Sequence, residues 1–153
     1  MKELDHLDEK ILQELCKDGR QSNQDLAAKV GLSASPCWQR TKRLERDGYI
    51  TGYYAALDMK KLGDLDTVLV EITLERQIFQ LEDVCKEIAS FPEVLEVHVT
   101  TGDFDIFVKV AVRGTAGYAK FLKERLHSIG AIRHSRSIFT LSCYKQLQST
   151  VAR

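Results

Sequence analysis

Residues 33–48 of this chain read SASPCWQRTKRLERDG, a pattern typical of one short helix with two different faces. Ser33 is a common residue type at a helix N-cap, and Pro36 falls in the first turn, where its missing N–H costs little. The expected buried face has three residues at helical spacing, namely Cys37, Thr41 and Leu44. The opposite side is then expected to carry Ser35, Gln39, Lys42, Arg43 and Arg46.

Two further helices are predicted upstream of this stretch. Residues 22–32, SNQDLAAKVGL, begin with Ser22 as an N-cap and place Asp25 in an approximate capping box. Gly31 suits the left-handed residue that ends such a helix. An earlier stripe of leucine and isoleucine at helical spacing predicts a longer helix over residues 5–18, followed by a stop at Gly19.

The last two of these helices are joined by the three-residue turn GLS at 31–33. A longer helix followed by such a pair is the arrangement of a helix-turn-helix unit, whose second helix enters the major groove of DNA. The alternative is a small helical bundle with a solvated basic face. The tight glycine turn, the hydroxyls at the helix start and the bases on one face together favour DNA binding.

The distribution of charge supports this interpretation. The whole chain has 22 basic and 22 acidic residues and no net charge, which disfavours non-specific coating of nucleic acid. Residues 36–46 nevertheless hold four bases and one acid, a local charge of +3. The first 35 residues hold five bases and seven acids, a charge of −2, so positive charge is concentrated in one helix.

The second part of the chain has a different pattern. Residues 49–58, YITGYYAALD, predict a wing or a linker strand leaving the helices. Strands are then predicted at 67–74, 94–101, 104–112 and 135–145, and helices at 77–91 and 116–129. The order β-α-β-β-α-β is that of the ferredoxin-like split unit, with two helices on one face of the sheet. The other face keeps apolar residues and is expected to pack against another copy of the chain.

The two central strands are joined by TTGDFD, residues 100–105. Gly-Asp between apolar runs indicates a hairpin turn, and from the residues alone a plain turn is the favoured interpretation. Asp105, however, is expected inside the following strand, where acids are disfavoured. Backbone N–H groups, two hydroxyls and two carboxylates are also suited to hold a small zwitterion.

Other function classes are disfavoured by what the sequence lacks. It contains no apolar run long enough to span a bilayer, and its polar N-terminus is not a secretory signal, so a cytoplasmic location is expected. The four widely spaced cysteines are expected to be reduced thiols. There is no G-x-S-x-G, P-loop or Rossmann glycine pattern, and the four histidines lack metal-ligand spacing. An enzyme is therefore not expected; an amino-acid-binding module that acts on a partner protein without DNA stays an alternative.

Three stretches together resemble the Lrp/AsnC family of transcriptional regulators. They are residues 4–33 and 35–53, which correspond to the DNA-binding part, and TGDFDIFVKV at 101–110. The resemblance covers nearly the whole chain in the right order. It implies an α+β chain with a winged helix-turn-helix domain at 1–52, a linker strand at 53–66 and a ferredoxin-like domain for ligand sensing and oligomerisation at 67–153. It also implies double-stranded DNA with partly palindromic sites as partner, assembly into dimers and commonly octamers, and no cofactor besides an amino-acid effector.

The resemblance also implies site residues. The segment that corresponds to the recognition helix contains Ser33, Ser35, Pro36, Cys37, Gln39, Arg40, Lys42, Arg43 and Arg46. Helical spacing assigns Cys37 to the core and Arg40 to the flank. We expect Arg43 and Arg46 to contact phosphate, and Ser35 and Gln39 to reach bases.

Trp38 is a further candidate DNA-binding residue. It either packs at the helix edge or contacts sugar-phosphate or a thymine methyl.

The resemblance also implies an effector site. The family binds amino acids near the TGDFD turn, at a contact between dimers, and this replaces the plain-turn interpretation. The implied effector-binding residues are Thr100, Thr101, Gly102, Asp103, Phe104 and Asp105.

Overall fold

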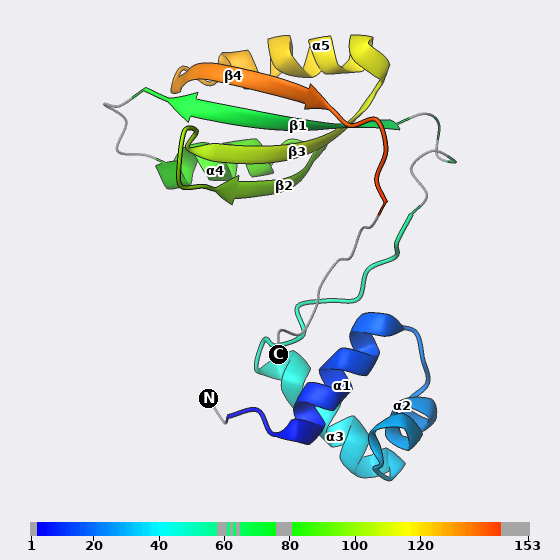
Figure 1. The fold of residues 1–153 in the computed structure, drawn as a ribbon. Coiled ribbons are helices and arrows are strands. Elements are labelled where there is room, and N and C mark those ends of the chain that lie inside the picture. The colour runs from blue at the N-terminus through cyan, green and yellow to red at the C-terminus, as the bar shows by residue number, and fades with distance from the viewer. Residues whose placement is uncertain (1–2, 58–60, 62, 64, 76–80, 145–153) are drawn as a thin grey trace. The chain divides into compact units, whose positions relative to one another are not determined.

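The computed structural model describes residues 3–57, 61, 63, 65–75 and 81–144. The chain divides into two compact units: the first ends at Ala56 and also includes Tyr144, and the second is Leu57–Cys143 (Figure 1). The first unit contains three helices, α1 (His6–Lys17), α2 (Asn23–Val30) and α3 (Ala34–Arg46). None of the described helices is long and apolar enough to cross a bilayer.

The helix boundaries follow from local capping chemistry. The Asp5 carboxylate accepts the backbone N–H groups of Leu7 and Asp8 and so caps α1. Ser22 Oγ accepts the N–H of Asp25 at 3.1 Å, and Gly31 ends α2 with a φ of 79°, as predicted. Ser33 stands at the N-cap of α3 as expected, but its side chain makes no capping hydrogen bond.

The three helices enclose a small apolar core. Its buried members are Ile11, Leu26, Ala27, Val30, Cys37 and Leu44. The predicted inner face of α3 is confirmed for Cys37 and Leu44, while Thr41 is half-buried and donates its hydroxyl to the Cys37 carbonyl at 3.0 Å. Packing of three amphipathic helices around this core holds α3 at the surface of the unit.

The wing or linker strand expected after α3 is not formed by the described residues 51–57. Residues 51–57 form neither helix nor strand, and residues 58–60, 62 and 64 of the expected linker lie outside the described part of the chain. An extended segment becomes a strand only when its backbone pairs with another, and no described strand pairs with 51–57. Tyr53 instead donates its hydroxyl to Glu45 on α3 at 3.0 Å.

The second unit is an antiparallel sheet with helices, and the predicted βαββαβ order is confirmed. Its elements are β1 (Leu65–Leu74), α4 (Leu81–Ala89), β2 (Val94–Val99), β3 (Ile106–Arg113), α5 (Gly114–Glu124), a 3-10 turn (Leu126–Ser128) and β4 (Ile132–Phe139). The strands lie in the order β2-β3-β1-β4. The described part of the helix expected at 77–91 begins at Leu81, and Phe79 lies outside the described residues. The last strand begins and ends earlier than the predicted 135–145, because it pairs with β1 from Ile132 to Phe139.

One face of this sheet forms the main core. Val68, Val70 and Ile72 of β1 alternate inward and are fully buried, as are Val108 and Val110 of β3. Both helices cover this face, and their buried contributions are Val84, Ile88, Tyr118 and Phe121. A helix-covered sheet face of this kind leaves the opposite face of the same strands available to contact other molecules.

That open face is mixed rather than apolar. Leu69 pairs with Ile138 of β4, and Phe107 lies on the adjoining strand β3. Ion pairs flank these apolar side chains, with Lys109 to Glu96 at 2.8 Å on one side and Arg136 to Glu71 on the other. Leu69 lies between Ile138 and Lys109 across the strands, and Phe107 lies opposite Glu71 in the next row. The expectation of an apolar open face therefore holds only for the small cluster formed by Leu69, Phe107 and Ile138.

Candidate nucleic-acid interface and ligand site

The exposed side of α3 carries a stripe of polar and basic residues. Four of them, which we call the outer stripe, are Ser35, Gln39, Lys42 and Arg46. At 3.6 residues per turn they fall within about 60° of arc, opposite Cys37 and Leu44. All four are exposed, and the Arg46 side chain is 74% exposed. The predicted outward direction of these four residues is confirmed.

The two cations of the outer stripe are themselves exposed, at 52% for Lys42 and 74% for Arg46, and among the described residues they pair with half-buried carboxylates. Lys42 Nζ lies 2.6 Å from Glu45, and Arg46 Nε lies 3.0 Å from Asp47. The pairing with Lys42 and the hydrogen bond from Tyr53 lower the pKa of Glu45, while burial and this bond raise the pKa of Tyr53 to about 12. Exposed ion pairs contribute little to stability, so both cations can exchange these partners for phosphate.

Arg40 and Arg43 are placed differently. Arg40 Nη1 lies 2.7 Å from Asp5 and 2.8 Å from Asp8, and Arg43 also pairs with Asp8. The Asp8 side chain is fully buried, while those of Arg40 and Arg43 are 27% and 20% exposed. The hydrogen bond from Arg40 lowers the pKa of Asp5 to about 2, and the pKa of Arg40 is raised in turn.

These contacts correct the expectation that Arg43 projects outward, opposite the buried face of α3. Its position on α3 is about 80° from Ser35, on the flank of the helix, and its guanidinium turns toward the N-terminal end of α1. Asp8 also accepts the Asp5 N–H in the capping box of α1, so one buried carboxylate joins that cap to two arginines of α3. We call Asp8, Arg40 and Arg43 the Asp8 clamp. Asp8 was not among the predicted site residues; its signal in the sequence is its place at the third residue of an N-terminal capping box.

The remaining residues predicted to contact DNA surround the start of α3. Ser33 and Pro36 are exposed in its first turn, and Trp38 is 54% exposed beside the outer stripe. Asn23 of α2 donates to the Ala34 carbonyl at 2.8 Å and ties the starts of the two helices together. The exposure of Trp38 disfavours its interpretation as a packing residue.

The 100–105 turn lies between β2 and β3 and is closed by its own hydrogen bonds. Thr100 N–H donates to the Asp105 carbonyl at 2.9 Å, and Thr100 Oγ1 donates to the Phe104 carbonyl at 2.8 Å. Gly102 has a φ of 120°, which only glycine adopts readily. Asp105 precedes β3 instead of lying inside it, and its Oδ2 accepts the Leu74 N–H at 2.8 Å. The carboxylate at this position therefore fastens the turn to the end of β1.

Two pockets adjoin this turn. The larger, about 410 Å³, is lined by Gly102, Asp103 and Asp105 together with Thr73, Leu74, Glu75, Leu81 and Arg133. The smaller, about 240 Å³, lies on the open face and is lined by Asp103, Phe104, Glu71, Thr73, His134 and Arg136. Thr100 and Thr101 line neither pocket. The walls supplied by β1 and β4 were not predicted from the sequence, because they depend on the pairing of Thr73 with His134.

Both pockets bring charges of opposite sign to the turn. Asp103 is exposed and lines both, Arg133 lines the larger one, and Arg136 lines the smaller one, where Glu71 raises its pKa. A small molecule with an ammonium and a carboxylate would find partners for both. Among the described residues, no three histidine, cysteine or acidic side chains are grouped as metal ligands.

Comparisons with known proteins agree with this description. The winged helix-turn-helix DNA-binding family matches residues 4–51, and the Lrp/AsnC ligand-binding domain matches residues 67–150. The leucine-responsive regulatory protein of Escherichia coli strain K12 is 40% identical over 148 residues, covering 95% of this chain and 89% of the relative.

Solved structures give the same result. A Neisseria meningitidis transcriptional regulator in complex with L-Met is 29% identical with a TM-score of 0.89, covering 97% of each chain. An AsnC family transcriptional regulator from Agrobacterium tumefaciens is 36% identical with a TM-score of 0.87, also covering 97% of each chain. The chain has both domains of these regulators in the same order and is not an enzyme. It belongs to the Lrp/AsnC family of DNA-binding transcriptional regulators.

Proposed function

We propose that this regulator contacts DNA through the outer stripe of α3, with Ser35 and Gln39 toward base edges and Lys42 and Arg46 toward phosphates. The observation that carries the proposal is the difference in pairing along α3. The Lys42 and Arg46 side chains are 52% and 74% exposed, whereas those of Arg40 and Arg43 are 27% and 20% exposed and are engaged by buried Asp8. Short polar side chains near the N-terminal end of a recognition helix are suited to base contacts. Ser33 at the N-cap of α3, and Pro36 and Trp38 in its first turns, would add contacts to the sugar-phosphate backbone of the DNA.

Charge reversal tests this assignment. DNA sites selected by the wild-type protein from a random pool serve as the probe, and binding is followed by fluorescence anisotropy. Lys42→Glu combined with Arg46→Glu is expected to abolish binding, because each reversal replaces an attraction to phosphate by a repulsion. Lys10→Glu, an exposed change on α1, is the control and is expected to bind within about threefold of wild type. Full binding by the double variant would contradict the proposal.

We propose further that the 100–105 turn binds an amino acid. The larger pocket offers Asp103 to an ammonium group and Arg133 to a carboxylate. The complex of the Neisseria meningitidis relative with L-Met supports this class of ligand. Asp105 contributes mainly by holding the turn, since one of its oxygens already accepts the Leu74 N–H. For regulation, the bound amino acid must favour one assembly or DNA-binding state over another.

Thermal unfolding with each of the twenty amino acids tests this site. A ligand present at about 100 times its Kd stabilises the folded chain by about 2.7 kcal/mol, which gives a clear shift in Tm. Asp103→Asn is expected to reduce that shift while leaving the Tm of the unliganded protein unchanged, because Asp103 is exposed. A shift that survives Asp103→Asn unchanged would place the ligand elsewhere.

The third part of the proposal concerns assembly. We expect a dimer through the open sheet face, with the cluster of Leu69, Phe107 and Ile138 at its centre, and association of dimers into octamers. Two recognition helices would then bind half-sites about one helical turn apart in a partly palindromic sequence. The regulator would act in the cytoplasm, where it meets DNA. Leu69→Lys is expected to produce monomers in sedimentation velocity, and an unchanged assembly would contradict the proposed interface.

A further inference from the structure

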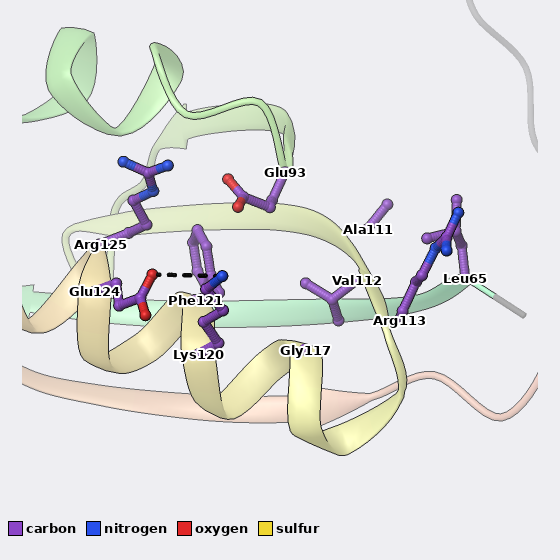
Figure 2. A pocket seen from close by; sticks show the side chains of 10 residues that line it. All are labelled: Leu65, Glu93, Ala111, Val112, Arg113, Gly117, Lys120, Phe121, Glu124 and Arg125. Carbon is purple, nitrogen blue, oxygen red and sulfur yellow. Dashed lines mark ion pairs between the residues drawn. The ribbon is translucent and has the colours of Figure 1, made fainter.

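A separate pocket lies at the opposite end of β3 from the 100–105 turn (Figure 2). Its volume is about 320 Å³, within the range of pockets that hold small molecules. Its walls come from the start of β1, the end of β3, the turn before β2, and α5. Because β3 has eight residues, this pocket is roughly 25 Å from the turn. It is therefore distinct from the effector site proposed above.

Glu93 supplies an unsatisfied charge to this pocket. Its backbone carbonyl accepts the Ala111 N–H at 2.8 Å, which fixes the residue just before β2. Its Oε2 atom is buried and has no hydrogen-bond partner among the described residues. A buried carboxylate oxygen without a donor is unfavourable. A ligand that brings an N–H donor to Glu93 would remove this cost.

Arg125 supplies the opposite charge. Its guanidinium lies over the ring of Phe91, 5.6 Å from the centroid, and Phe91 packs edge-on against Phe121. Among the described residues, no carboxylate forms an ion pair with Arg125. Glu93, which lines the same pocket, does not pair with it either. The aromatic contact holds the guanidinium in place but leaves its planar set of N–H donors available to a carboxylate.

From these observations we propose that the pocket is a second ligand site that takes an α-amino acid. The ligand's ammonium donates to Glu93 and its carboxylate accepts from Arg125. Arg113 also lines the pocket, at the end away from Arg125 (Figure 2). The opposite charges of Glu93 and Arg125 line the pocket without pairing, and a zwitterion satisfies both together. A simple amine or a simple carboxylic acid satisfies only one of them. The rim residues Lys120 and Glu124 are already paired with each other at 3.9 Å (Figure 2).

Gly117 on α5 allows the pocket to be filled by substitution. A Cβ atom at this position would have its nearest neighbours at 3.7 Å, in Arg113 and Val112, so a methyl group fits without strain. Gly117 is not among the described glycines with a positive φ. Gly117→Leu is expected to occupy the pocket, whereas Gly117→Ala is a matched change that leaves most of it open.

Isothermal titration calorimetry of the full-length protein with each of the twenty L-amino acids tests the proposal. At least one amino acid is expected to bind with a Kd that rises about 10- to 100-fold in Glu93→Gln, the loss expected when a charged hydrogen-bond partner is removed. Gly117→Leu should abolish the same binding. Gly117→Ala, Glu124→Gln and Asp103→Asn should leave its Kd within about threefold. The amine and the carboxylic acid that correspond to this amino acid should each bind at least tenfold more weakly.

The proposal is overturned if no amino acid binds in a manner sensitive to Glu93→Gln. That result includes the case in which all binding is lost in Asp103→Asn alone, which would leave the turn as the ligand site. If Gly117→Leu does not fold, as judged by circular dichroism, the isosteric pair Glu93→Gln and Glu124→Gln decides the question. Equal binding by that pair would also contradict the proposal.

Discussion

Neutralising Asp8 is the substitution that most directly perturbs the Asp8 clamp. Asp8→Asn keeps the shape of the side chain but removes the charge that Arg40 and Arg43 share. Breaking a buried ion pair from one side typically costs 3–5 kcal/mol. Because both guanidinium groups are partly exposed and can be hydrated, we expect a smaller loss of about 2–4 kcal/mol.

Urea unfolding measures this loss. Trp38, the only tryptophan, lies on α3, so its fluorescence reports on the helical unit, and circular dichroism follows the whole chain. Glu9→Gln, an exposed change in the same turn of α1, is the control and should change the free energy of unfolding by less than about 0.5 kcal/mol. In a double-mutant cycle, Arg43→Gln should cost much less in the Asp8→Asn background than in wild type. An additive cycle, or a loss in Asp8→Asn no larger than the control, would refute the clamp.

Three other predictions follow from the described contacts. The pKa of Asp5 is lowered to about 2 by Arg40, so wild type should be more stable than Asp5→Asn above pH 4, and urea midpoints should show this difference disappearing as the pH falls toward 2. Asp105→Ala should lower the free energy of unfolding by about 1–3 kcal/mol, because the buried Leu74 N–H loses its acceptor; an unchanged urea midpoint would contradict this. Gly31→Ala should cost about 1–2 kcal/mol, because it forces a residue with a Cβ into the left-handed region, and thermal unfolding would detect it.

Much of the fold could be predicted because its signals are local. Ser22 and Gly31 mark the two ends of α2 through capping geometry, which depends on only a few neighbouring residues. The strand and helix order of the second unit followed from hydrophobic alternation and periodicity. Strand ends were less accurate, since the extent of β4 is set by its partner β1 and not by its own residues.

The side-chain partners within the site could not be predicted in the same way. Helical periodicity placed Arg43 with the outward residues of α3, but its side chain pairs with Asp8, which lies 35 residues earlier in the chain. Asp105 was noticed as an acid in an unfavourable position, and its structural reason, the Leu74 N–H, lies 31 residues away. Pairings of this kind depend on how elements pack together, which local patterns do not report.

The salt dependence of DNA binding tests the central claim, that the outer stripe and not the Asp8 clamp contacts DNA. Anisotropy titrations over a range of salt concentrations would compare wild type with Arg46→Gln and Arg43→Gln. Each phosphate contact contributes about 0.9 to the slope of log K against log salt. We predict that Arg46→Gln lowers the magnitude of the slope by about 0.9 for each copy of α3 bound, while Arg43→Gln leaves it unchanged. An unchanged slope in Arg46→Gln, or an equal decrease in Arg43→Gln, would contradict the account.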